Sequence, residues 1–266
     1  MSPRSARQWR FGLSDALLLG TAAVLLAATA AALLRLDVPW LTAILSRRWI
    51  IYTVTVAMVL VVLAAFAAFE EGRASAHEIA VVAVLSAASI ALRVAFAALP
   101  SVQPCTFIIL TAGVVYGPRA GFMVGALTAL VSDMFLGQGL HTPFQMFAWG
   151  AAGACGGLVG LLRPGVGRWG LAALGLVWGF LFGWITNLSM LFFYREVTRR
   201  VLVLVYGMSV PFDAVHAASN VVFALLFAPE VLWVLRRYRR RFEVTYLEGA
   251  APAPPTGPSG PPLSGG

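Results

Sequence analysis

The chain has 266 residues, of which 60% are hydrophobic and 11% are charged, and its formal net charge is +8. Soluble domains carry about 25% charged residues, so the composition excludes an ordinary soluble domain and predicts an all-α integral membrane protein. The basic residues are all arginines, and all except Arg93 stand at or beyond the ends of apolar segments, not in one patch. This pattern indicates anchoring in a lipid bilayer and argues against nucleic-acid binding.

Eight apolar segments follow one another along the chain, at residues 12–34, 49–69, 77–99, 104–116, 119–136, 144–162, 170–193 and 204–235. The fourth is too short to cross a hydrocarbon core of about 30 Å, so we expect neighbouring helices to shield it. A charged break at 70–75 separates the first two segments from the last six. It predicts an N-terminal extension with two transmembrane helices (1–72) and a six-helix core (73–242). The Pro- and Gly-rich tail (243–266) is expected to be disordered.

The arginine distribution predicts how the chain is oriented. With the N-terminus inside, the cytoplasmic stretches hold twelve arginines and the outer loops hold six. Because cytoplasmic loops are enriched in Arg and Lys, we expect both termini to lie in the cytoplasm.

Ionisable and amide side chains within membrane segments are costly, so each one is a candidate functional residue. Such residues are Arg93, Asp133, Asn187, Asp213, His216 and Asn220. The last three recur at i, i+3 and i+7 and therefore share one helical face. In the predicted orientation, these polar groups lie mainly toward the outer side of the membrane.

Two loops open on that same outer side, at 101–104 and 137–143. They and the start of the next segment carry Gln103, Gln138, His141, Thr142 and Gln145. Together with the intramembrane polar residues they describe an outward-facing polar cup, which is typical of a protein that binds a polar solute.

Structural roles for the same residues stay open. Arg93 can form a salt bridge with Asp133 or Asp213, since a charge in lipid needs a partner. Asn220 can serve as an interhelical hydrogen-bonding group, and His216 can be a packed core histidine.

Small side chains form a ridge on the third segment, where Ala83, Ala87, Ala91 and Ala95 repeat every four residues. Such a ridge allows another helix to approach closely.

The sequence lacks the motifs of common catalytic and metal sites. It has no P-loop, no H-E-x-x-H and no G-x-S-x-G motif. Cys105 and Cys155 have no partner at metal-ligand spacing. We therefore expect a protein that is not an enzyme and that uses no metal or cofactor.

Two blocks of the sequence resemble the substrate-specific (S) components of energy-coupling factor (ECF) transporters, the vitamin uptake systems of prokaryotes. The first block covers 103–150 and the second, PFDAVHAASNVVFALL, covers 211–226 and is followed by a basic end at 236–241. Within the first block, GQGLHTPFQMFAWG (137–150) looks most like the S components assigned to cobalamin.

The resemblance implies a six-helix core in a prokaryotic plasma membrane, with both termini cytoplasmic. It implies one vitamin-type solute bound near the outer face, a membrane T component docked on the alanine ridge, and two cytoplasmic ATPase subunits. The sequence departs from the pattern in two ways. The segments at 12–34 and 49–69 lie outside it, and Asp133 stands where cobalamin-type relatives are expected to carry an amide.

Three hypotheses follow for the function. The first is a substrate-binding subunit that captures cobalamin or a related corrinoid, or else another vitamin or vitamin precursor. The second is a stand-alone ion-coupled transporter with Arg93, Asp133 and Asp213 as a proton relay, and the third is a membrane scaffold without transport. Under the first hypothesis, Arg93 and Asp133 shape the cup, and the solute contacts Gln103, Gln138, His141, Thr142, Gln145, Asp213, His216 and Asn220.

Overall fold

The computed structural model describes residues 47–72 and 74–242, and all regular structure in that part of the chain is helical. Six of the described helices are long and apolar enough to cross a membrane. The helices are α3 (Arg47–Glu71), α4 (Ala76–Ala95), α5 (Pro104–Tyr116), α6 (Pro118–Leu136), α7 (Thr142–Leu162), α8 (Arg168–Thr186), the 3-10 helix η1 (Asn187–Phe193) and α9 (Arg199–Phe242). The prediction of an all-helical, multi-pass membrane protein is therefore confirmed.

The helix ends follow from local sequence. Gly117 adopts a positive φ of 94°, and Pro118 begins α6 directly after it. Gly137, with φ 109°, ends α6 in the same way. Residues without a Cβ adopt this left-handed region without strain, so these glycines turn the chain sharply between packed helices.

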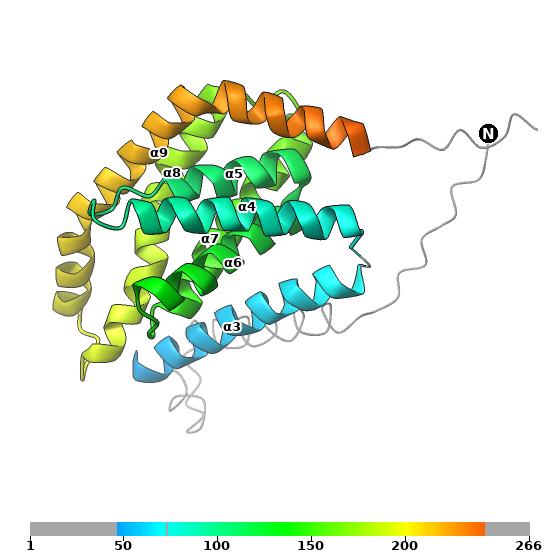
Figure 1. The fold of residues 1–266 in the computed structure, drawn as a ribbon. Coiled ribbons are helices and arrows are strands. Elements are labelled where there is room, and N and C mark those ends of the chain that lie inside the picture. The colour runs from blue at the N-terminus through cyan, green and yellow to red at the C-terminus, as the bar shows by residue number, and fades with distance from the viewer. Residues whose placement is uncertain (1–46, 73, 243–266) are drawn as a thin grey trace, which may run out of the picture.

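The short helix α5 lies at the centre of the bundle, among α4, α6, α7 and α9 (Figure 1). All of its thirteen residues are buried except Ile108 and Tyr116, which are partly buried. Its neighbours shield it on all sides, as the sequence predicted for a helix too short to cross the bilayer core.

Glycines bring the packed helices into backbone contact. A Cβ at Gly121 of α6 would lie 2.3 Å from the carbonyl oxygen of Gly153 on α7. A Cβ at Gly179 of α8 would lie 2.3 Å from the Cα of Ala217 on α9. Close approach through small residues is a common basis of helix association in membranes.

Two segments end differently from the sequence expectation. The segment expected at 170–193 divides into α8 and η1, where the Thr186 hydroxyl bonds back to the carbonyl oxygen of Phe182 at 2.9 Å. The segment expected at 204–235 is one 44-residue helix, α9, with Pro211 and Pro229 inside it.

The helix α3 packs against α6 and α7 and lies along one side of the bundle (Figure 1). An Arg119 guanidinium nitrogen on α6 donates to the carbonyl oxygen of Ala68 on α3. The helix expected at 12–34, the tail 243–266 and both termini lie outside the described residues.

Candidate functional site

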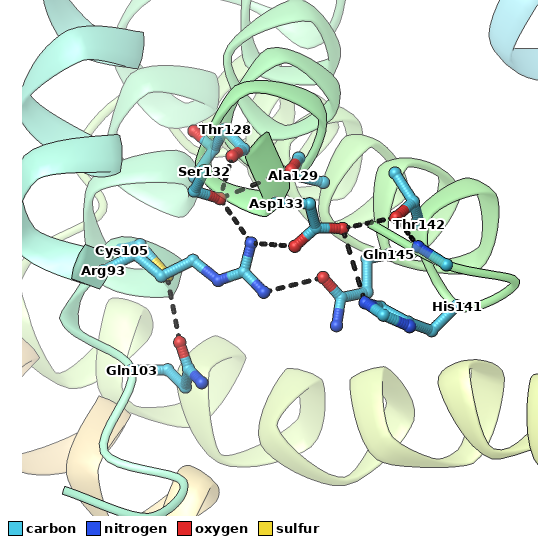
Figure 2. Close-up of polar contacts among 11 residues, drawn as sticks. Arg93, Gln103, Cys105, Thr128, Ala129, Ser132, Asp133, His141, Thr142 and Gln145 are labelled. Atoms are coloured by element: carbon cyan, nitrogen blue, oxygen red, sulfur yellow. Dashed lines mark hydrogen bonds and ion pairs between the residues drawn. The ribbon is translucent and has the colours of Figure 1, made fainter. Parts of the chain in front are cut away.

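A buried ion pair joins α4 to α6. Arg93, with 7% of its side chain exposed, places one guanidinium nitrogen 2.7 Å from Oδ1 of the fully buried Asp133 (Figure 2). The same nitrogen donates to the Ser132 hydroxyl. The second terminal nitrogen donates to Oε1 of Gln145 on α7 at 2.8 Å. Of the two partners considered from the sequence, Arg93 therefore pairs with Asp133.

The second oxygen of Asp133 holds the loop between α6 and α7. It accepts a hydrogen bond from the Thr142 hydroxyl at 2.7 Å, and Nε2 of His141 lies 3.7 Å from it (Figure 2). Gly139 in turn donates its N–H to the Thr142 hydroxyl at 3.3 Å. One carboxylate thus connects α4, α6, α7 and the polar loop.

Trp149 of α7 links this network to α9. Its ring, fully buried, lies under the Arg93 guanidinium carbon at 4.6 Å from the ring centroid. Its Nε1–H donates to the Thr106 hydroxyl at 2.9 Å, and that hydroxyl lies 2.8 Å from Nε2 of His216. On its other side the ring stacks on Phe182 of α8, with centroids 4.4 Å apart and an interplanar angle of 27°.

A cavity of about 230 Å³ lies beside His216, between the α4–α5 loop, α8, η1 and α9. Both polar and aromatic side chains line it. The lining consists of Ser101, Gln103, Phe182, Gly183, Thr186, Asn187, Ser209, Phe212, Asp213 and His216.

Asp213 is the acidic residue among those that line this cavity. Its side chain is 5% exposed, and the Ser209 hydroxyl lies 2.9 Å from its Oδ2. Asn187 Nδ2 donates to that same hydroxyl at 2.7 Å. Within 47–72 and 74–242, no basic side chain forms an ion pair with Asp213. A carboxylate held in this way retains free acceptor capacity toward a bound molecule.

Gly183 makes room for this carboxylate. A Cβ at position 183 would lie 1.8 Å from Oδ1 of Asp213. Because α8 carries no side chain here, the carboxylate can lie directly against the helix.

The residues expected to form one cup divide into two adjacent groups. Gln103, Asp213 and His216 line the cavity. The group around the ion pair consists of Arg93, Asp133, His141, Thr142 and Gln145.

Two expected site residues lie elsewhere. Gln138 is exposed on the α6–α7 loop. Asn220 is fully buried and donates from Nδ2 to the carbonyl oxygen of Gly175 at 3.0 Å, while its Oδ1 has no partner among the described atoms. It bridges α8 and α9 without lining the cavity.

The serine, threonine and phenylalanine residues of the cavity were not predicted from the sequence, because hydroxyl and aromatic side chains are common in membrane helices and do not by themselves indicate a binding site. Ser209 could have been predicted from its spacing, since it lies four residues before Asp213 and so shares its helical face. Gly183 could have been predicted from a repeat, since Gly175, Gly179 and Gly183 recur every four residues along α8. In the described part of the chain, no group of three or more His, Cys, Asp or Glu residues is placed to hold a metal ion.

The alanine ridge is accessible on the surface of α4. All four of its residues are exposed, namely Ala83, Ala87, Ala91 and Ala95. The opposite face of α4 is buried, with Arg93 among its residues. One helix therefore contributes both to the polar interior and to an outward surface of small side chains.

Comparison with known proteins identifies the family. Residues 73–232 match the family described as "ECF-type riboflavin transporter, S component". No curated protein and no solved structure matches the chain. The matched region runs from the start of α4 to Leu232 in α9 and covers more than half of the chain. The S-component resemblance is thereby confirmed, although a cobalamin-type specificity is not, and the chain belongs to the S-component family of ECF-type transporters.

Proposed function

We propose that the chain captures a vitamin in the cavity between α8 and α9, as the substrate-binding subunit of an ECF-type importer. The observation that carries this proposal is the Asp213 carboxylate, nearly buried in the cavity wall and held there by a single hydroxyl. An uncompensated carboxylate is costly within a membrane protein, which favours a functional role for it. A solute that donates an N–H or O–H to it would lower that cost.

The lining matches a flat ring that carries polar groups. Phe182 and Phe212 offer aromatic surface, while Gln103, Asn187 and Asp213 offer amide and carboxylate groups. Riboflavin has this character, since it joins a planar three-ring system with an imide to a hydroxylated chain. The family description also names riboflavin, so riboflavin is the first candidate.

Cobalamin is the second candidate, supported by the resemblance of residues 137–150 to cobalamin-type S components. The cavity of about 230 Å³ lies below the 300–1,000 Å³ typical of small-molecule sites. A corrinoid macrocycle is far larger than a flavin and would require the loops at 101–103 and 137–143 to separate. The Thr142–Asp133 hydrogen bond of 2.7 Å opposes that separation. The smaller vitamin therefore fits with less rearrangement.

The remaining predicted site residues take supporting roles in this proposal. Arg93 and Asp133 would stabilise the packing of α4 and α6 next to Trp149 through their ion pair. The other residues expected to contact the solute, Gln138, His141, Thr142, Gln145 and Asn220, would meet it only through opening of the α6–α7 loop or motion of α9. A proton relay is less well supported, since no hydrogen bond or ion pair of the described residues joins the Arg93–Asp133 pair to Asp213.

The importer would be completed by a membrane T component and two cytoplasmic ATPases, as the family implies. We propose that the T component docks on the exposed ridge of α4. The chain would lie in a prokaryotic plasma membrane with both termini in the cytoplasm, and the cavity would open outward.

Titration of the purified full-length protein with riboflavin, followed by quenching of flavin fluorescence, tests the proposal. Asp213→Asn is expected to weaken binding about tenfold to a hundredfold, because hydrogen bonds to a charged group are among the stronger ones. Glu196→Gln is the matched control, since Glu196 is an exposed carboxylate away from the cavity. A parallel titration with cyanocobalamin decides between the two vitamins. Failure of both to bind with sub-micromolar affinity would overturn the proposal.

A further inference from the structure

A second and larger cavity lies where the start of α8 meets the C-terminal part of α9. Its volume is about 750 Å³. The predicted orientation places this end of the molecule at the cytoplasmic surface of the membrane. Its lining includes Arg168, Arg236, Arg237, Arg240, Leu232 and Trp233.

The arginines of this cavity are positioned by neutral groups. Arg236 donates to the carbonyl oxygens of Pro164 and Val166 at 3.2 and 2.7 Å. The Arg237 guanidinium lies over the Trp233 ring, with its carbon 5.2 Å from the ring centroid. These contacts orient the guanidinium groups without neutralising their charge.

No carboxylate of the described residues forms an ion pair with the four arginines of the cavity. Glu230, the acidic residue of α9 nearest to them in sequence, does not line the cavity. A neighbouring cavity of about 250 Å³ shares Arg236 and Arg240 with the first. The end of the molecule therefore presents concentrated positive charge in a concave surface.

Apolar side chains stand next to this charge. Leu232 is buried in the cavity wall, and Trp233 is 61% exposed. On the other helix, Trp169 is 68% exposed and carries the Arg168 guanidinium over its ring at 5.7 Å. Tryptophans beside arginines are typical of the level where acyl chains give way to headgroups.

We propose that this cavity binds the headgroup of an anionic phospholipid from the cytoplasmic leaflet. The arginines would contact the phosphodiester, for which guanidinium geometry is well suited, and Leu232 and Trp233 would contact the glycerol and upper acyl chains. Basic pockets between transmembrane helices at the cytoplasmic surface bind such lipids in other membrane proteins. The site shares no lining residue with the cavity proposed for the vitamin, so each proposal can be tested independently of the other.

Native mass spectrometry of the full-length protein tests the proposal, with phosphatidylglycerol and phosphatidylcholine supplied at equal concentration. We expect retention of phosphatidylglycerol over phosphatidylcholine. The double variant Arg237→Gln/Arg240→Gln should weaken phosphatidylglycerol binding about 25-fold, since each arginine near a membrane surface contributes about fivefold. Arg236 is left in place because it bonds to the backbone of the α7–α8 loop.

Arg163→Gln is the matched control, because Arg163 is exposed in the same loop region and lines neither cavity. It should bind phosphatidylglycerol as the unchanged protein does. Arg237→Lys/Arg240→Lys should retain most of the preference, and thermal unfolding should show that every variant is folded. Vitamin binding should be unaffected by the double Gln variant.

Equal retention of the two lipids, or unchanged phosphatidylglycerol binding in the double Gln variant, would overturn the proposal. Displacement of the lipid by millimolar inorganic phosphate would identify a site for a small free anion instead. Loss of ATPase binding in the double variant, with lipid binding intact, would assign the arginines to a protein partner.

Discussion

The position of the Asp213 carboxylate depends on Gly183 of the neighbouring helix α8, because a glycine has no side chain. A Cβ at position 183 would lie 1.8 Å from Oδ1 of Asp213. The nearest side-chain donor to the carboxylate is the Ser209 hydroxyl on its own helix. One methyl group on α8 is therefore enough to displace the group on which the proposed site depends.

We expect Gly183→Ala to weaken vitamin binding at least tenfold, because the carboxylate must leave its present position. Gly207→Ala is the matched control, since a Cβ at that helical position meets nothing within 4 Å. Fluorescence titration gives the affinity, and thermal unfolding shows whether the fold is kept. Equal affinities for the two variants would contradict the role given to Gly183.

The ion pair between Arg93 and Asp133 should contribute more to stability than to binding. Asp133→Ala leaves a buried guanidinium without its countercharge and is expected to lower the free energy of unfolding by about 3–5 kcal/mol. The double variant Arg93→Met/Asp133→Leu should lose less than the single variant, since no charge stays unpaired. Chemical unfolding in detergent micelles measures both. A single variant as stable as Glu196→Ala, which removes an exposed carboxylate, would show that the pair is dispensable.

Individual site residues could be predicted from the sequence only where their chemistry is unusual for a membrane. Arg93, Asp133 and Asp213 were identified because charge is rare in such segments. For Asn220 the sequence left two roles open, since an amide suits either a solute or a backbone carbonyl, and the structure shows the interhelical one. Phe182 and Phe212 gave no signal at all, because their positions depend on how α8 and α9 pack.

At the scale of helices, hydropathy predicted most of the architecture. The short helix α5 was expected at 104–116 and is found at Pro104–Tyr116. The boundary between α8 and η1 was missed, because a change from α-helical to 3-10 hydrogen bonding leaves the hydropathy of the segment unchanged. The length of α9 was underestimated, because its arginine-rich end is helical although it is not apolar.

The exposed ridge of α4 gives a prediction about assembly. Ala87→Leu/Ala91→Leu adds bulk to an exposed surface, so the fold and vitamin binding should be unchanged. Docking of the T component should be lost, and ATP-driven uptake by the reconstituted complex should fall at least tenfold. Ala173→Leu, the same change at an exposed position of α8, is the control. Normal uptake by the double variant would place the docking surface elsewhere.

At the scale of the whole molecule, the described part of the chain contains the cavity proposed to bind a vitamin but nothing that resembles an ATPase. Proteoliposomes that contain the chain alone should show no vitamin uptake under a proton or sodium gradient. Addition of the T component and the ATPase subunits with ATP should start uptake. Gradient-driven uptake by the chain alone would support the ion-coupled transporter instead.

The helix α9 runs from the cavity proposed for the vitamin to the arginine-lined cavity and bends along its length (Figure 1). Asp213 and Arg237 are separated by about 36 Å of helix, more than the thickness of the hydrocarbon core. Pro211, two residues before Asp213, has no N–H to donate and so removes one bond from the helical ladder at that point. Pro229, which lines the arginine-lined cavity, removes a second bond from the ladder. We therefore expect α9 to bend most easily next to each of its two cavities, so that a change of shape at one cavity leaves the helical stretch between the two prolines straight.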